Sequence, residues 1–173
     1  AASDVYKRQL RVPQDPATVT SAVTVLDPDA LQNQGLFQLR DALNQSPGVI
    51  STSTGGQTGA LGSLFIRGTT TAYSQLVIDG MRLGDSTTPL GNMLAAGRTY
   101  DFGRIEILRG PQGAIYGGES IGGVLWLETP RGSGAPGGSA TFEGGSFNSL
   151  AGHASFQGTV GKLSYYLGGG YEE

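Results

Sequence analysis

The sequence has no cysteine, one histidine and few charged residues, and each shortage removes a class of function. The lack of cysteine excludes disulfides, thiolate zinc sites and cysteine nucleophiles. A single histidine, His153, excludes a metal site built from several histidines. Charged residues make up 14% of the chain against a usual ~25%, and the net charge is −3, so composition predicts no nucleic-acid partner. No apolar run approaches the ~18 residues of a membrane-spanning helix.

Glycine is what the chain has in excess. It accounts for 30 of 173 residues, more than twice the usual ~7%. Disorder is not predicted, because the net charge is small and 38% of the residues are hydrophobic. The surplus of glycine, serine and threonine with scattered aromatics indicates strands joined by turns.

The first nine residues are treated separately. Residues 4–9 read DVYKRQ, which resembles the translation of a transposon-end adapter used in DNA library preparation. We interpret residues 1–9 as a non-native scar and exclude them from the fold prediction, the alternative being an ordinary polar tail. With a scar at the start, the native N-terminus and any signal peptide would be missing.

Residues 10–131, with a core at 19–130, predict a mixed α/β unit. Asp27 before Pro28 is typical of a helix start, and Ser46-Pro47-Gly48 predicts the end of a second helix. Short apolar strands are predicted at 22–26, 49–50, 64–68, 76–80, 105–108 and 124–129. Two long polar loops, 51–63 and 84–99, remain, and loops of this length in a compact domain are usually functional.

The pattern changes after residue 131. Residues 132–138 read as a glycine-rich linker, and 139–173 alternate apolar and polar residues with period two, enough for three strands. Strands of about ten residues with this alternation and short turns are typical of a transmembrane β-barrel, which needs about eight strands or more. The fold class predicted is therefore α+β: a small mixed-sheet domain followed by the first antiparallel strands of a truncated barrel.

Two short motifs resemble catalytic or cofactor sites. Residues 118–122 fit G-x-S-x-G, and Ser120 with Glu128 or Glu143 and then His153 has the order of a serine hydrolase. A strand should precede such a serine and a helix follow it, but here a glycine-rich loop precedes it and a strand follows. Residues 132–137 fit G-x-G-x-x-G but contain proline and lead into a strand, so we expect no nucleotide site there. No catalytic residue, cofactor or metal is predicted.

Arg67, Arg104 and Arg109 flank apolar strands beside turn residues. An arginine near a buried face needs an acidic partner, and Glu106 can serve one of the three. The others would find partners outside these residues or lie exposed at strand ends, and the residues alone leave both alternatives open.

Four motifs in order, at 65–68, 77–83, 104–117 and 121–124, resemble the plug domain of TonB-dependent outer-membrane receptors. Residues 39–43 and 47–49 also fit, so the resemblance covers roughly 19–130. Within the family, the pattern at 63–69 and the short first barrel hairpin are most similar to cobalamin-type transporters. Residues 118–120 and 125–127 depart from the family pattern. The motif turn residues are Gly68, Asp79, Gly80, Gly110, Pro111, Tyr116, Gly117, Gly122 and Gly123.

The resemblance implies a function as well as a fold. The plug of such a receptor binds a scarce solute, a siderophore or cobalamin, and gates its energised uptake across the outer membrane of a Gram-negative bacterium. Its partners would be that ligand, outer-membrane lipid and the TonB energy-coupling complex, whose contact segment is not recognisable here. Arg67 and Arg109 would pair with barrel glutamates to lock the plug. Residues in the two long loops would face the ligand: Gln57, Thr58, Ser86 and Asn92. A serine hydrolase using Ser120, or a soluble α/β binding domain, are the alternatives.

Overall fold

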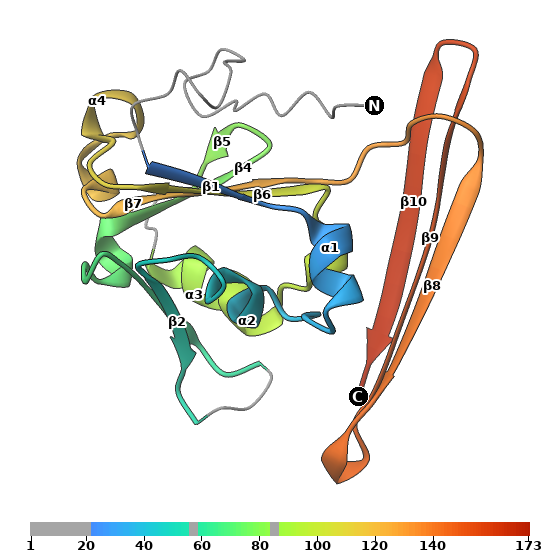
Figure 1. Cartoon of the computed structure of the whole chain (residues 1–173), viewed down its shortest axis with the longest axis horizontal. Helices are drawn as coiled ribbons and strands as arrows, with labels where there is room; N and C mark the ends of the chain where they lie inside the picture. Colours follow the sequence, from blue (N-terminus) through green and yellow to red (C-terminus); the bar gives the residue numbers. More distant parts are fainter. Residues whose placement is uncertain (1–21, 56–58, 84–86) are drawn as a thin grey trace. The chain divides into compact units, whose positions relative to one another are not determined.

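A computed structural model describes residues 22–55, 59–83 and 87–173 (Figure 1). The predictions made for residues 1–21 lie outside the described residues, as do Gln57, Thr58 and Ser86. The chain divides into two compact units, with the division between Thr129 and Pro130. Each unit is described by itself.

The first unit contains a five-stranded mixed sheet in the order β1-β6-β7-β4-β5. Only β4 and β7 run parallel, and the other neighbours are antiparallel. The strands are β1 (Ala22–Leu26), β6 (Arg104–Arg109), β7 (Gly123–Glu128), β4 (Ser74–Ile78) and β5 (Met81–Arg82). A separate antiparallel pair joins β2 (Val49–Ser53) to β3 (Gly62–Ile66).

Among the described residues of this unit, four helices accompany these strands: α1 (Pro28–Asn33), α2 (Leu39–Leu43), α3 (Thr87–Ala96) and α4 (Gly113–Tyr116). Asp27 caps α1 as predicted, because its carboxylate accepts the Asp29 N–H at 3.0 Å and Pro28 opens the first turn. Single 3₁₀ turns lie at η2 (Thr71–Tyr73), η3 (Thr99–Asp101), η4 (Gly118–Ser120) and η5 (Ser146–Asn148).

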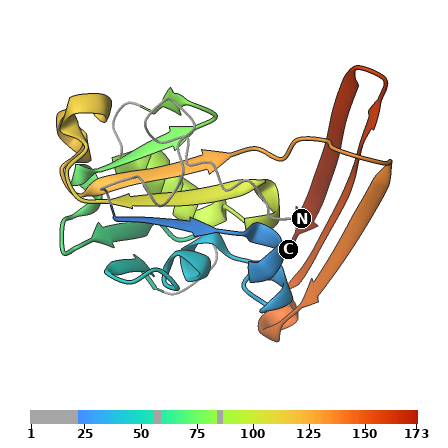
Figure 2. The ribbon, with the colours of Figure 1, turned by 45° about the horizontal axis from the view of Figure 1, so that its top comes forward.

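The central strands are apolar on both faces, which explains their continuous hydrophobic runs. On one face, Ile105 and Ile107 pack with leucines of α2 and α3, and both helices lie on that side of the sheet (Figures 1 and 2). On the other face, Leu108, Val124 and Trp126 form a second cluster. The mixed sheet with short helices confirms the predicted fold of this unit.

Both predicted loops are shorter than expected. β2 continues to Ser53 and β3 begins at Gly62, because alternate residues of the polar stretch face the core. Residues 87–96 of the second loop form α3, with Leu90 and Leu94 buried one turn apart. Two buried leucines in ten residues give a weak periodic signal, which is why the helix was not predicted.

The second unit is an antiparallel sheet in the order β10-β9-β8, as expected. Its strands are β8 (Gly137–Gly144), β9 (Leu150–Val160) and β10 (Leu163–Glu172), so β8 begins within the stretch interpreted as linker. The register places most of the large apolar side chains on one face, where the following are exposed: Phe142, Leu150, Phe156, Val160, Leu163, Leu167 and Tyr171. Within the described residues, no helix is long and apolar enough to cross a membrane.

Candidate functional site

Asp79 and Gly80 form the turn between β4 and β5. Ile78 pairs with Met81, and φ is 49° at Asp79 and 85° at Gly80, as a type I′ hairpin turn requires. The Asp79 carboxylate also accepts hydrogen bonds from the N–H of Thr129 at 3.0 Å and from its hydroxyl at 2.8 Å. Asp79 therefore shapes a turn and fixes the last residue of the first unit.

Arg67 and Gly68 form a second turn of this kind after β3. The Thr69 N–H donates to the Ile66 carbonyl at 3.1 Å, and φ is 51° at Arg67 and 81° at Gly68. A left-handed conformation costs a non-glycine residue about 1–2 kcal/mol. A residue keeps such a conformation only where contacts with its surroundings stabilise it, so the contacts of Arg67 matter.

Arg109 ends β6, and its neighbour Gly110 makes room for Arg67. Gly110 has a φ of 109°, and its N–H donates to the Gly122 carbonyl at 2.8 Å. A Cβ atom at Gly110 would lie 3.2 Å from Arg67 Nη1. The missing side chain therefore leaves space for the Arg67 guanidinium beside the end of β6.

The turn between α2 and β2 contacts both arginines. The Arg67 N–H donates to the Gly48 carbonyl at 2.8 Å, and Arg109 Nη1 donates to the Pro47 carbonyl at 2.5 Å. The structure thus gathers the two predicted lock arginines, which are 42 positions apart in the sequence, around one turn.

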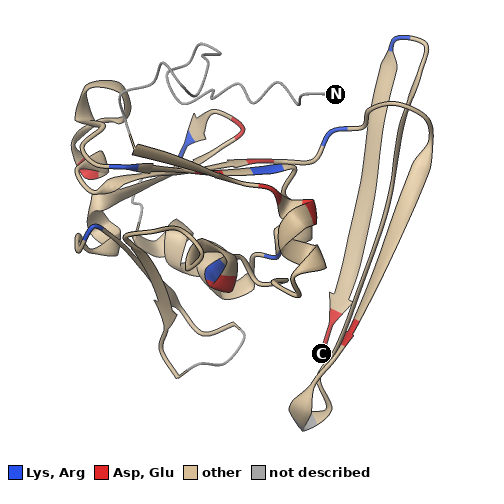
Figure 3. Ribbon diagram, in the orientation of Figure 1, with Lys and Arg blue, Asp and Glu red and all other residues tan. Residues whose placement is uncertain are grey.

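The two arginines differ from Arg104 in their charge partners. Arg104 Nε forms an ion pair with the fully buried carboxylate of Glu106, as the sequence allowed. In the part of the chain that the structure describes, neither Arg67 nor Arg109 has an acidic partner, and the buried Nε of Arg109 has no hydrogen-bond partner. Charged residues are sparse along both units (Figure 3). The arginine pair is therefore a local concentration of positive charge.

The remaining motif residues support the ends of β6 and β7. Tyr116 packs edge-on against Trp126, with 6.2 Å between the ring centroids. A Cβ at Gly122 would lie 1.9 Å from Thr69 Oγ1, and one at Gly123 would lie 2.2 Å from a backbone carbonyl of β6. Gly117 has a φ of 89° and lies against the Arg82 guanidinium. That guanidinium donates a hydrogen bond to the Tyr116 carbonyl at 2.7 Å. Pro111, by contrast, is exposed.

Of the predicted ligand-facing residues, the structure describes Asn92, which is exposed on α3 rather than in a loop. The β2–β3 connection lies against this helix. The Gly59 N–H donates to the Ala95 carbonyl at 3.1 Å, and a Cβ at Gly62 would lie 2.4 Å from Leu94 Cβ. The two segments predicted as ligand-facing thus meet at one end of the first unit.

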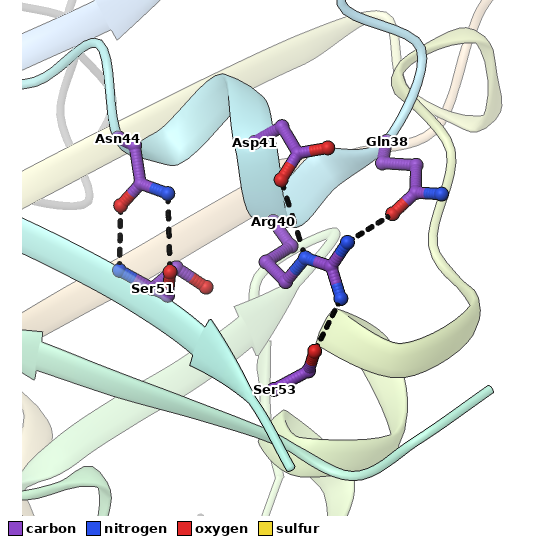
Figure 4. A network of polar contacts seen from close by, with 6 residues as sticks. All are labelled: Gln38, Arg40, Asp41, Asn44, Ser51 and Ser53. Carbon is purple, nitrogen blue, oxygen red and sulfur yellow. Dashed lines mark hydrogen bonds and ion pairs between the residues drawn. The ribbon is translucent and has the colours of Figure 1, made fainter. Parts of the chain in front are cut away.

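A polar network between α2 and β2 was not predicted from the sequence (Figure 4). Arg40 donates to the Ser53 hydroxyl at 2.6 Å and to the Gln38 side-chain carbonyl at 2.8 Å, and it pairs with Asp41 at 3.2 Å. The Asn44 side chain accepts the Ser51 N–H at 2.7 Å and donates to the Ser51 carbonyl at 3.0 Å. The only sequence signal was a polar helix face opposite Leu39 and Leu43.

Ser120 lacks the surroundings of a hydrolase nucleophile. It lies in the 3₁₀ turn η4 between α4 and β7, is fully buried, and donates its hydroxyl to the Gly117 carbonyl at 2.5 Å. A nucleophile elbow instead exposes its serine between a strand and a helix.

Comparisons with known proteins agree with this geometry. The family model for the TonB-dependent receptor plug domain matches residues 15–124. The vitamin B12 transporter BtuB of Vibrio vulnificus is 32% identical over 119 residues, which are 69% of this chain and 19% of that protein. The chain therefore spans about a fifth of this curated relative's length.

Solved structures show the same fold across both units. The ferripyoverdine receptor of the Pseudomonas aeruginosa outer membrane matches with a TM-score of 0.80 and 16% identity, over 96% of this chain and 22% of that one. The siderophore receptor PirA from Acinetobacter baumannii matches with a TM-score of 0.65 and 25% identity, over 87% and 24%. Because 96% of this chain is covered, the match to the ferripyoverdine receptor includes strands of the second unit. Because the family model covers well over half of its residues, this chain belongs to the TonB-dependent receptors, and the matched part is a plug domain.

Proposed function

We propose that the chain is the plug and first barrel strands of an outer-membrane transporter in a Gram-negative bacterium. The transporter binds a scarce solute and gates its energised uptake. The observation that carries this proposal is the placement of Arg67 and Arg109 around one turn without an acidic partner in the described residues.

The two arginines lock the plug through carboxylates on the barrel wall. A barrel large enough to carry a plug would cover this end of the domain and remove water from both guanidinium groups. Each arginine then needs an acidic partner, because an unpaired charge in such a place is very costly. Arg109 is only partly buried in the described chain, so its guanidinium remains within reach of a carboxylate that the barrel supplies.

The solute is a siderophore or a cobalamin-type molecule. Receptors for both classes are among the proteins to which the chain is similar. The solute contacts the end of the plug where the β2–β3 connection meets α3, with Asn92 exposed nearby. Gln57, Thr58 and Ser86 belong to the same two segments of the sequence.

Two further partners complete the proposal. Outer-membrane lipid covers the apolar face of β8–β10, on which Leu163 and Leu167 are each more than two-thirds exposed. The TonB energy-coupling complex supplies the force that breaks the arginine pairs and opens a path beside or through the plug.

Leakage through the complete receptor tests the lock. We expect Arg67→Ala and Arg109→Ala to raise the ion conductance of receptors in planar bilayers and antibiotic entry into cells, because removing one partner of a buried pair costs about 3–5 kcal/mol. Arg131→Ala is the control, since its side chain is exposed, whereas Arg82 is bound to the Tyr116 carbonyl and is not used. Arg98, which the sequence placed beside a loop, is only 8% exposed and is unsuitable as a control. Equal leakage in lock and control variants would refute the assignment.

A further inference from the structure

The α2–β2 turn that contacts both arginines is a type II turn. The Val49 N–H donates to the Ser46 carbonyl at 3.1 Å, which closes four residues. Pro47 occupies the second position, and Gly48 occupies the third with a φ of 74°. Proline followed by a residue with positive φ is the pattern of this turn type.

The turn type decides where the Pro47 carbonyl points. Types I and II differ by a rotation of about 180° of the peptide between their two central residues, and only type II needs positive φ at the third position. The observed peptide directs the Pro47 carbonyl to Arg109 Nη1, at 2.5 Å. The other orientation would turn this carbonyl away and leave Arg109 without its described hydrogen bond.

We propose that Gly48 is a positioning residue for the plug lock: its left-handed conformation holds the Pro47 carbonyl against Arg109 while its own carbonyl holds the Arg67 turn. The inference rests on the proposed function, in which these arginines pair with barrel carboxylates. Arg109 has a planar, fork-shaped guanidinium, so a hydrogen bond to Nη1 fixes the direction in which its other N–H groups face. One turn therefore orients both arginines.

The network of Figure 4 connects this turn to the ligand-facing end. Asn44 forms two hydrogen bonds to the backbone of Ser51, and Arg40 donates to Ser53 farther along β2. These contacts join α2 to β2 side by side, and the turn is the covalent link between them.

The test compares three variants of the complete receptor. Gly48→Ala disfavours the positive φ, and its Cβ would lie 3.9 Å from Arg67 Cγ, an ordinary contact, so conformation and not a clash is altered. Gly35→Ala is the matched control, because Gly35 has a φ of 75° with nothing within 4 Å of its Cβ position. Gly48→Asn is the conservative variant, since asparagine tolerates this conformation.

We expect Gly48→Ala to increase the frequency of open events in planar bilayers by about fivefold to thirtyfold, the population ratio that corresponds to the cost of a left-handed alanine. Gly35→Ala and Gly48→Asn should stay near the unmodified level. In the 173-residue chain, hydrogen exchange of the Arg67 amide should be faster in Gly48→Ala than in the other two variants. An increase confined to this amide would show that the variant folds but loses the hydrogen bond from Arg67 to the Gly48 carbonyl.

Three results would overturn the inference. The first is that Arg109→Ala leaks but Gly48→Ala leaks no more than Gly35→Ala. The lock assignment would then hold, but Gly48 would not be its positioning residue. The second is equal leakage of Gly48→Ala and Gly48→Asn, which would make side-chain size the cause. If Arg109→Ala does not leak, the lock itself fails and this inference fails with it.

Discussion

The ion pair between Arg104 and Glu106 gives the sharpest prediction for the stability of the first unit. Glu106 lies within β6, and its side chain is fully buried between cross-strand neighbours that include Trp126. Replacement of Arg104 by methionine keeps most of the aliphatic length but removes this ion-pair partner of the carboxylate. Loss of one partner of a buried pair costs about 3–5 kcal/mol. We expect a loss of about 3 kcal/mol in the free energy of unfolding, because the Arg104 side chain is 22% exposed and water partly screens the pair.

Urea unfolding of the whole chain measures this loss. Trp126 is the only tryptophan, so its fluorescence reports on the first unit without interference from β8–β10. With an m-value of about 2 kcal/mol/M, Arg104→Met should lower the midpoint by about 1.5 M. The double variant Arg104→Met with Glu106→Leu should recover most of the difference, because it leaves no buried charge.

The exposed Arg131 supplies the control, and Arg131→Met should change the free energy of unfolding by less than about 0.5 kcal/mol. A loss below about 1 kcal/mol in Arg104→Met, or a double variant as unstable as the single one, would refute the reasoning that the carboxylate depends on this arginine.

Two further predictions concern packing and association. Gly62→Ala should destabilise the first unit by about 1–3 kcal/mol in the same urea assay, because the new Cβ would lie 2.4 Å from Leu94 Cβ. Gly59→Ser is the comparison: nothing lies within 4 Å of its Cβ position, so any loss of stability should come mainly from its φ of 82°. The 173-residue chain should associate in solution through the open edges and exposed apolar face of β8–β10. Truncation after residue 131 should give a more soluble monomer, as measured by light scattering. The same oligomeric state in the full and truncated chains would argue against this.

The sequence predicted those parts of the fold that depend on residues close together in the chain. Asp27 and Pro28 start a helix through their own backbone chemistry, and Asp79-Gly80 forms its turn because both residues tolerate positive φ. The period-two pattern predicted the three antiparallel strands of the second unit. The helix α3 was missed because only Leu90 and Leu94 mark its buried face.

The candidate site was predicted by residue but not by geometry. The motif resemblance selected Arg67 and Arg109, yet no local pattern shows that both contact the turn at Pro47–Gly48, since that depends on how β3 and β6 end in space. Arg98 lies in the stretch 84–99 that was predicted as a loop, but the structure buries it at the start of η3. Tertiary placement decided each of these cases.

The central claim is that these residues are the plug and first barrel strands of a receptor, and the gene downstream of the Glu173 codon tests it most directly. The account predicts hundreds of further residues in strands of about ten, alternating apolar and polar side chains, with short turns on one side and long loops on the other. It also predicts glutamate or aspartate residues facing the barrel interior as partners for Arg67 and Arg109. A stop codon shortly after Glu173 in the intact gene would contradict the account.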